Sequence, residues 1–191
     1  MDNNENRNGK GRFRSNRNDD RPKDTAGRIV PRDKELEQAV LGAMMLEKDA
    51  YTTVCDLLKP ESFYEPEHQM VYEAIQTLAA AQKPIDMLTV IEQMRANDTL
   101  DKGGGPAYIA ELTACITSAA HVEYHARIVA QKYLARELIN FAANIEGKAY
   151  DETNDVDDLL QEAEGRLFEI SQRNVKKDVT QIDPVISQAL H

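Results

Sequence analysis

The feature that most constrains the fold of this chain is a long stretch, beginning at Ser118, that meets neither proline nor glycine until Gly147. Because these two residues disfavour helix interiors, the stretch predicts one continuous helix of about 45 Å at 1.5 Å per residue. Such a helix is too long for a small compact domain. Its apolar side chains recur with the 4-3-4 spacing of a coiled-coil seam: Leu134, Leu138, Phe141 and Ile145.

A second helical pattern follows a short polar turn at residues 150–154. It repeats the same seam spacing with Val156, Leu160, Ala163, Leu167 and Ile170. Two helices with matching seams and a short connection form an antiparallel hairpin. The sequence therefore predicts a helical hairpin over residues 118–173.

The predicted hairpin has apolar side chains on more than one face, because six lie off the seams: Ile128, Val129, Tyr133, Ile139, Leu159 and Phe168. Apolar surface that two helices cannot bury against each other needs a further partner. Either the hairpin folds back onto residues 31–117, or copies of the chain pair through it. We favour self-association, since a projecting arm cannot reach its own domain along its whole length. The residues predicted to take part are Ile128, Tyr133, Leu134, Leu138, Phe141, Ile145, Leu160, Leu167 and Phe168.

Residues 31–117 show the pattern of several short helices around a core, for which an apolar content of 41% is sufficient. Asp33 and Asp86 are predicted N-caps, since their carboxylates accept hydrogen bonds from the free amides of a first turn. Pro60 and Pro84 separate helical patterns. The helices are expected within residues 33–44, 50–58, 67–82, 86–96 and 107–116. Alternating runs typical of strands are missing, so the predicted fold class is all-α, with a compact multi-helix globule followed by the long hairpin.

The net charge of -10 is unevenly distributed. Residues 1–28 hold eight Lys or Arg against five Asp or Glu, a charge of +3, and the remainder holds 15 against 28, a charge of -13. An acidic body repels phosphate backbones, so we expect little direct nucleic-acid binding by the folded part. Residues 1–30 contain little to bury and are interpreted as a disordered basic tail, either a solubilising leader or a weak contact with nucleic acid.

The end of the chain is predicted to be a linker. A polar stretch at residues 172–178 follows the hairpin, and Pro184 then suits the first position of a new helix. The apolar residues of this linker helix are Ile182, Val185, Ile186 and Leu190. Because the helix has only begun at His191, we expect residues 174–191 to lead into a further domain of a longer protein.

Cysteine usage and hydropathy indicate a cytoplasmic protein. Cys55 and Cys115 have no C-x-x-C neighbour, which favours two buried thiols over a disulfide framework or zinc site. No apolar run approaches the roughly 18 residues of a membrane span, and no signal peptide precedes the first helix. No membrane partner is expected.

Three motifs in the sequence have some features of catalytic or metal sites. The glycines at 103–105 lack the Gly-Lys-Ser/Thr of a phosphate-binding loop and are interpreted as a turn. His121, Glu123 and His125 form H-x-E-x-H, whereas a zinc protease needs H-E-x-x-H and a zinc deaminase a later P-C-x-x-C. We interpret these histidines as exposed or packed in the hairpin.

The third motif has acidic and hydroxyl residues at calcium-loop spacing: Asp151, Thr153, Asp155, Asp157 and Glu162. Val156 occupies the position at which that loop requires glycine. Helix-capping acids at the start of the second hairpin helix explain the same residues. No catalytic residue, cofactor-binding residue or metal ligand is predicted in this chain.

Several strings resemble, in order and spacing, the amino-terminal domain of the bacterial replicative DNA helicase, the DnaB family. They are Glu35–Met44 (ELEQAVLGAM), Phe63 and Tyr64 with His68, Pro84–Thr89 (PIDMLT), Gly104–Leu112 (GGPAYIAEL), and Ser118–Ala120 leading to Tyr124–Val129 (YHARIV). The resemblance runs from about Pro31 to Arg173. The basic tail lies outside it.

This resemblance implies a function for the chain. In that family the amino-terminal domains pair through their hairpins and close, as a trimer of dimers, into a collar on a hexameric ring. The collar receives the helicase-binding domain of primase, and a helicase loader is a further candidate partner. ATP and magnesium would bind in the ATPase domain, which lies outside this chain. By resemblance, residues 118–173 are the pairing arm and residues 182–190 begin the linker helix.

Two other classes of function remain open at this point. One is a small metal-dependent enzyme built on His121, Glu123 and His125, which elemental analysis would reveal. The other is a free-standing helical adaptor, which a stop codon directly after His191 would favour.

Overall fold

The computed structural model describes residues 27–114 and 120–179, with side chains up to residue 172. The chain divides into two units, Met1–Val30 and Pro31–His191, and all the helices named here lie in the second. They are α1 (Lys34–Leu46), α2 (Ala50–Val54), the 3-10 helix η1 (Pro60–Ser62), α3 (Pro66–Ala80), α4 (Met87–Ala96), α5 (Gly105–Ala114), α6 (Val122–Ala149) and α7 (Val156–Val179). Every regular element in the described ranges is a helix, which confirms the all-α prediction.

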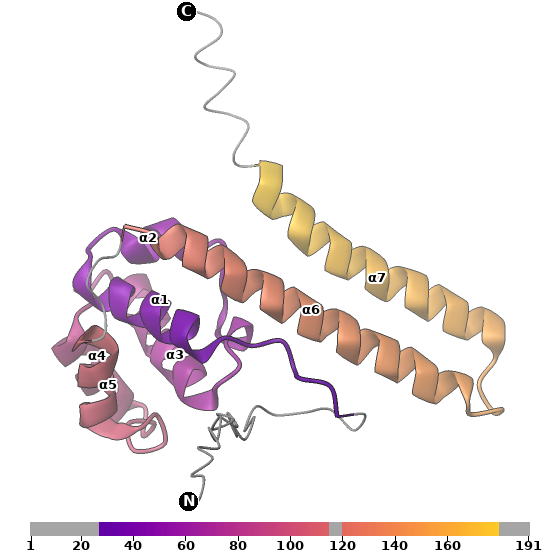
Figure 1. Ribbon diagram of the computed structural model, residues 1–191, viewed down its shortest axis with the longest axis horizontal. Helices are drawn as coiled ribbons and strands as arrows, with labels where there is room; N and C mark the ends of the chain where they lie inside the picture. The colour runs from indigo at the N-terminus through magenta and orange to yellow at the C-terminus, as the bar shows by residue number, and fades with distance from the viewer. Residues whose placement is uncertain (1–26, 115–119, 180–191) are drawn as a thin grey trace, which may run out of the picture. The chain divides into compact units, whose positions relative to one another are not determined.

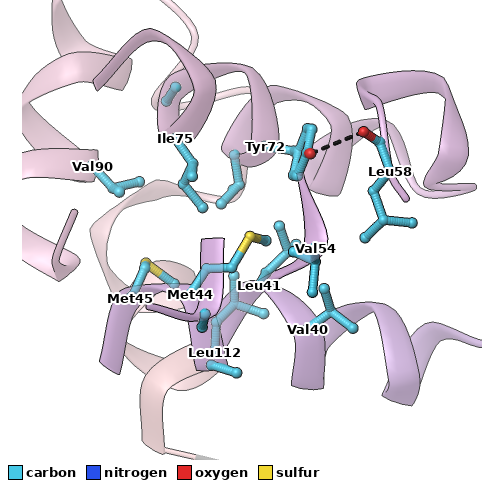
Figure 2. Packing of buried hydrophobic residues seen from close by; sticks show 14 of the residues in the cluster. Val40, Leu41, Met44, Met45, Val54, Leu58, Tyr72, Ile75, Val90 and Leu112 are labelled. Carbon is cyan, nitrogen blue, oxygen red and sulfur yellow. Dashed lines mark hydrogen bonds between the residues drawn. The ribbon is translucent and has the colours of Figure 1, made fainter. Parts of the chain in front are cut away.

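Helices α1 to α5 form a globule around a single apolar core, of which Figure 2 shows the centre. Val40, Leu41 and Met44 lie on one face of α1, at the spacing that places side chains on the same side of a helix. Tyr72 and Ile75 of α3 are fully buried against them. The Tyr72 hydroxyl donates to the Leu58 carbonyl at 3.0 Å, so the one polar atom of this ring is satisfied inside the core.

The helix boundaries follow the predicted capping chemistry. Asp33 caps α1 by accepting from the Leu36 amide at 3.1 Å, and Asp86 caps α4 by accepting from the Leu88 and Thr89 amides. The glycines at 103–105 form a turn that leads directly into α5, as predicted. Gly104 has φ +92°, a backbone conformation that favours glycine, and therefore fixes the direction in which the chain enters α5.

Three helix boundaries differ from the predictions. The second helix is shorter, because α2 ends at Val54 and turns lead to η1, which Pro60 begins. The helix predicted from Ser118 begins at Val122, and residues 115–119 lie outside the described ones. The polar stretch interpreted as a linker is helical, since α7 continues to Val179. Polarity was a poor guide there because a helix without proline or glycine needs no apolar residue in its last turns.

Helices α6 and α7 lie side by side as the predicted hairpin (Figure 1). The N-terminal part of α6 also packs on α1, α2 and η1, so the hairpin is rooted in the globule. None of the helices in the described ranges combines the length and apolarity that a membrane crossing requires. Cys55 is partly exposed rather than buried as predicted, because it follows the short α2 at the surface; Cys115 lies outside the described residues.

Candidate self-association surface

The turn of the hairpin is fixed by its own acidic residues. Asp151 accepts hydrogen bonds from the amide and hydroxyl of Thr153 at 3.0 and 2.7 Å, and these bonds hold the pKa of Asp151 below its ordinary value. Asp155 accepts from the amides of Asp157 and Asp158 and so caps α7. Glu162 pairs with Lys148 across the two helices. Of the residues at calcium-loop spacing, Asp155 caps α7 as predicted, whereas Asp151 and Thr153 hold the turn and Glu162 makes a cross-helix ion pair that was not predicted.

The H-x-E-x-H motif lies at the start of α6. The His121 and His125 rings are 6.4 Å apart between centroids, and Glu123 pairs with Arg127 at 2.7 Å on the same helix. Within the described ranges, no three His, Cys, Asp or Glu side chains are placed so that they could hold a metal ion. The geometry gives no support to a metal centre at this motif.

The root of the hairpin belongs to the core of the globule. Val122, Ala126 and Val129 are buried in the same apolar cluster as α1 and α3. Their 4-3 spacing continues to Tyr133 and then Arg136, so both lie on the face of α6 that packs on the globule. The predicted pairing residue Tyr133 is half-buried here, with the Lys59 ammonium 4.8 Å from its ring centre.

Arg136 anchors this face of α6. Its guanidinium donates to the Pro31 carbonyl at 2.9 Å and to the Ser62 carbonyl at 2.8 Å, and it lies over the rings of Tyr64 and Tyr133. Burial lowers the pKa of Arg136 from its ordinary value, and the negative charge of Glu37 opposes that shift. Sequence reasoning missed this residue. The indication available was a charged side chain continuing a buried stripe.

The predicted pairing residues divide into two groups by exposure. Half-buried are Ile128, Tyr133, Leu134, Phe141 and Ile145. Exposed are Leu138 at 40%, Leu160 at 58%, Leu167 at 49% and Phe168 at 63%. The exposed group lies mostly on α7, where Val156 adds to it with 77% exposure. We call Val156, Leu160, Leu167 and Phe168 the α7 apolar stripe.

The seam predicted for α7 is thus partly wrong. Of its five residues, Ala163 and Ile170 lie toward the interior, whereas Val156, Leu160 and Leu167 are exposed. Leu159, predicted to lie off the seam, is half-buried instead. An inward face through Leu160 and one through Leu159 differ by a single position along the helix. The packing of α7 against α6 determines which of the two faces inward. The predicted linker-helix residues Ile182, Val185, Ile186 and Leu190 lie outside the described residues.

A comparison with known families decides what kind of domain this is. The model of the DnaB-like helicase N-terminal domain matches residues 29–131. The chain belongs to that family. The resemblance seen in the sequence motifs is thereby confirmed, and with it the all-helical architecture of a DnaB-like N-terminal domain.

Curated relatives of this DnaB-like domain are replicative DNA helicases. It is 41% identical to DnaB of Rhodothermus marinus over 165 residues, which cover 86% of this chain and 17% of the relative. It is 40% identical to DnaB of Geobacillus stearothermophilus over 76% of this chain and 32% of the relative. It is 36% identical to DnaC of Bacillus subtilis over 84% of this chain and 36% of the relative. The chain therefore spans between 17% and 36% of the length of these relatives.

Two solved structures share the fold of this DnaB-like domain. The crystal structure of the N-terminal domain of DnaB helicase from Mycobacterium tuberculosis matches with a TM-score of 0.67 and 34% identity, covering 73% of this chain and 99% of that one. The structure of a DnaB-like replicative helicase and its interactions with primase matches with a TM-score of 0.61 and 25% identity, covering 78% of this chain and 35% of that one.

Proposed function

We propose that this chain is the oligomerisation and primase-docking domain of a replicative DNA helicase, which as a full-length hexamer unwinds DNA at the replication fork with ATP. The domain itself carries no chemistry in this proposal. ATP and magnesium are bound by an ATPase domain outside this chain. Its partners are further copies of itself, arranged as a trimer of dimers, and the helicase-binding domain of primase.

The α7 apolar stripe is the observation that carries self-association. Its residues are exposed although they recur at helical spacing, and a helix with an apolar stripe normally buries it. The acidic residues beside it, among them Asp157 and Glu164, keep the rest of the helix solvated. A helical stripe of leucine and phenylalanine with charged flanks suits pairing with a second helix of the same kind.

Primase docking is supported by the family relationship. One similar structure is that of a DnaB-like replicative helicase and its interactions with primase, and it shares 25% identity over 78% of this chain. The motifs that carry the resemblance span both the globule and the root of the hairpin. We therefore expect the primase helicase-binding domain to recognise the folded domain rather than the basic tail.

Self-association is tested by measuring the mass of the chain in solution across micromolar concentrations. We expect dimers or larger species, and we expect Leu167→Asp to shift them to monomer, because a charge in the paired interface would be desolvated. Gln172→Asp is the control, since Gln172 is exposed and lies about 140° around α7 from Leu167. Circular dichroism checks that both variants keep their helices. A wild-type chain that stays monomeric at the highest concentration contradicts the proposal.

Primase docking needs a separate test. Titration of the chain with a primase C-terminal domain, followed by calorimetry, should give saturable binding that survives deletion of residues 1–26. Absence of heat and of a mass increase on mixing counts against docking but leaves self-association standing. Loss of binding on deleting the tail instead assigns docking to the tail, contrary to the proposal.

A further inference from the structure

Arg136 has no part in the α7 apolar stripe, yet its side chain makes two hydrogen bonds to the globule and lies over two aromatic rings. The two carbonyls that Arg136 contacts belong to Pro31, just before α1, and to Ser62, at the end of η1. These segments are far apart in sequence from each other and from α6. One side chain therefore ties the hairpin to two separate parts of the globule.

Two aromatic rings lie close to the Arg136 guanidinium. The Arg136 guanidinium carbon lies 5.5 Å from the Tyr64 ring centre and 5.6 Å from the Tyr133 ring centre. Arg32 lies over Tyr64 as well, at 5.1 Å, and pairs with Glu65 at 2.6 Å. A planar guanidinium is suited to stacking on rings while donating from two of its nitrogens, which a lysine ammonium does not reproduce.

The loop after η1, whose Tyr64 ring lies near Arg136, is held in place by the buried carboxylate of Glu37. Glu37 of α1 accepts from the Tyr64 amide at 2.8 Å and lies 2.6 Å from Nδ1 of His68. The other ring nitrogen of His68 is 2.7 Å from the Tyr108 hydroxyl of α5. Glu37 and His68 are both fully buried. A continuous hydrogen-bonded network thus runs from α5 through α3 and α1 to the loop on which Arg136 rests.

Beyond this anchor α6 emerges from the globule, since Leu138 and Ile139 are exposed. The part of α6 from Arg136 to Ala149 is about 20 Å long at 1.5 Å per residue, so a rotation of about 10° at the root would move its far end by about 3–4 Å. Apolar side chains touch within about 4 Å. A small change of angle at Arg136 is therefore enough to separate residues paired near the hairpin turn.

We propose that Arg136 is a positioning residue that fixes the angle between the hairpin and the globule, and that pairing of two copies depends on this angle. The second part rests on the proposed self-association, whereas the first does not. Arg136 acts through the direction of α6 rather than by touching the partner.

The angle is measured as a distance between two spin labels within one chain. Glu73→Cys on α3 and Glu146→Cys on α6 place the labels at exposed helical positions, in a background in which Cys55 and Cys115 are Ser. The labelled chain is diluted into an excess of the same unlabelled chain, so that only distances within one copy are recorded. Arg136→Met is compared with Arg127→Met, a control on the same helix whose arginine pairs along the helix with Glu123.

We expect a single narrow distance distribution in the wild type and in Arg127→Met, and a distribution about twofold wider in Arg136→Met, which lacks both donors and the stacking plane. Self-association should weaken by about tenfold in Arg136→Met only. A distribution as narrow as the wild type in folded Arg136→Met overturns the positioning role. If Arg136→Met loses its helical circular dichroism signal, Arg136→Lys is measured in its place. A wider distance distribution in Arg136→Lys supports the positioning role, and a distribution of wild-type width overturns it.

The two proposals fail separately. A monomeric wild-type chain with a widened Arg136→Met distribution refutes self-association and retains the positioning role. If the wild type associates and the distance distribution of Arg136→Met is as narrow as that of the wild type, self-association is retained and the positioning role is refuted. Widening without any loss of association overturns the dependence of pairing on the angle.

Discussion

The globule of α1 to α5 and the second helix of the hairpin use apolar residues at the same helical spacing but bury them very differently. In the globule, Leu41 and Tyr72 are 0% exposed. In α7, among the side chains described up to residue 172, only Ile170 is buried, and the α7 apolar stripe lies at the surface.

The difference follows from how many neighbours each helix has. Helix α1 contacts α2, α3, α5 and α6, so its apolar face is covered from several directions. Among the described elements, α6 is the one on which α7 packs extensively. A single neighbouring helix covers only one face of α7. Periodicity therefore identifies an apolar face, whereas the number of packed neighbours decides whether the chain itself can bury it.

The largest effect should come from the globule. Leu41→Ala removes a fully buried side chain from the centre of the core, and it should lower the free energy of unfolding by about 3–4 kcal/mol through lost burial and an unfilled cavity. Urea denaturation monitored by circular dichroism measures this loss. Leu88→Ala is the control, because Leu88 is 67% exposed on α4 and should change little. Equal losses in the two variants would contradict the assignment of the core.

The buried carboxylate of the globule should come next. Glu37→Ala leaves the Tyr64 amide and the His68 ring without their acceptor, and we expect a loss of about 3 kcal/mol in unfolding free energy. The contrasting change in the hairpin is Glu162→Ala, which removes an exposed ion pair with Lys148 and should cost at most about 1 kcal/mol. Denaturation of both variants in the same buffer compares them. A larger loss of unfolding free energy in Glu162→Ala than in Glu37→Ala would contradict this prediction.

A smaller effect is expected at Tyr72, whose pKa is raised above its ordinary value of 10.0 chiefly by burial. The unfolded phenol ionises from about pH 10 while the folded one stays protonated, so the unfolding free energy should fall as pH rises above about 10. Tyr72→Phe should cost about 1 kcal/mol at pH 7, for the lost bond to Leu58, and should lessen that alkaline fall.

The pH dependence does not vanish in Tyr72→Phe, because burial also raises the pKa of Tyr51 and Tyr108. Unfolding free energies between pH 8 and pH 11 give the comparison. An identical alkaline fall in the wild type and in Tyr72→Phe would show that Tyr72 does not contribute.

Local sequence chemistry predicted much of this fold. Asp33 and Asp86 were identified as caps because the side chain that accepts the bonds lies next to the amides that donate them. The hairpin was predicted because helix length and turn position are also local properties of the sequence. Both kinds of inference need no knowledge of distant contacts.

The site was less predictable because it depends on contacts between distant segments. The choice between Leu159 and Leu160 as inward residues turns on the packing of α7 against α6. Arg136 could not be linked to Pro31 or Ser62 from sequence, since backbone carbonyls leave no residue-type pattern. A charged residue on a buried stripe marks a position of interest without identifying its partners.

The smallest effect on the stability of the isolated chain is expected within α7. Phe168 is 63% exposed and Ile170, two residues further on, is 5% exposed. Phe168→Ala should therefore change the unfolding free energy of the monomer by less than about 0.5 kcal/mol, whereas Ile170→Ala should cost about 2 kcal/mol or more. Denaturation at a concentration at which the chain is monomeric measures both.

Repeating the measurement at high concentration sharpens the contrast, because association stabilises only the folded state that pairs. If Phe168 contacts a second copy, Phe168→Ala should lose most of the added stability that the wild type gains with concentration, while remaining equal to the wild type when dilute. A Phe168→Ala loss in the dilute chain as large as that of Ile170→Ala would mean that the α7 apolar stripe is covered within one copy, and the distinction between the two regions would then fail.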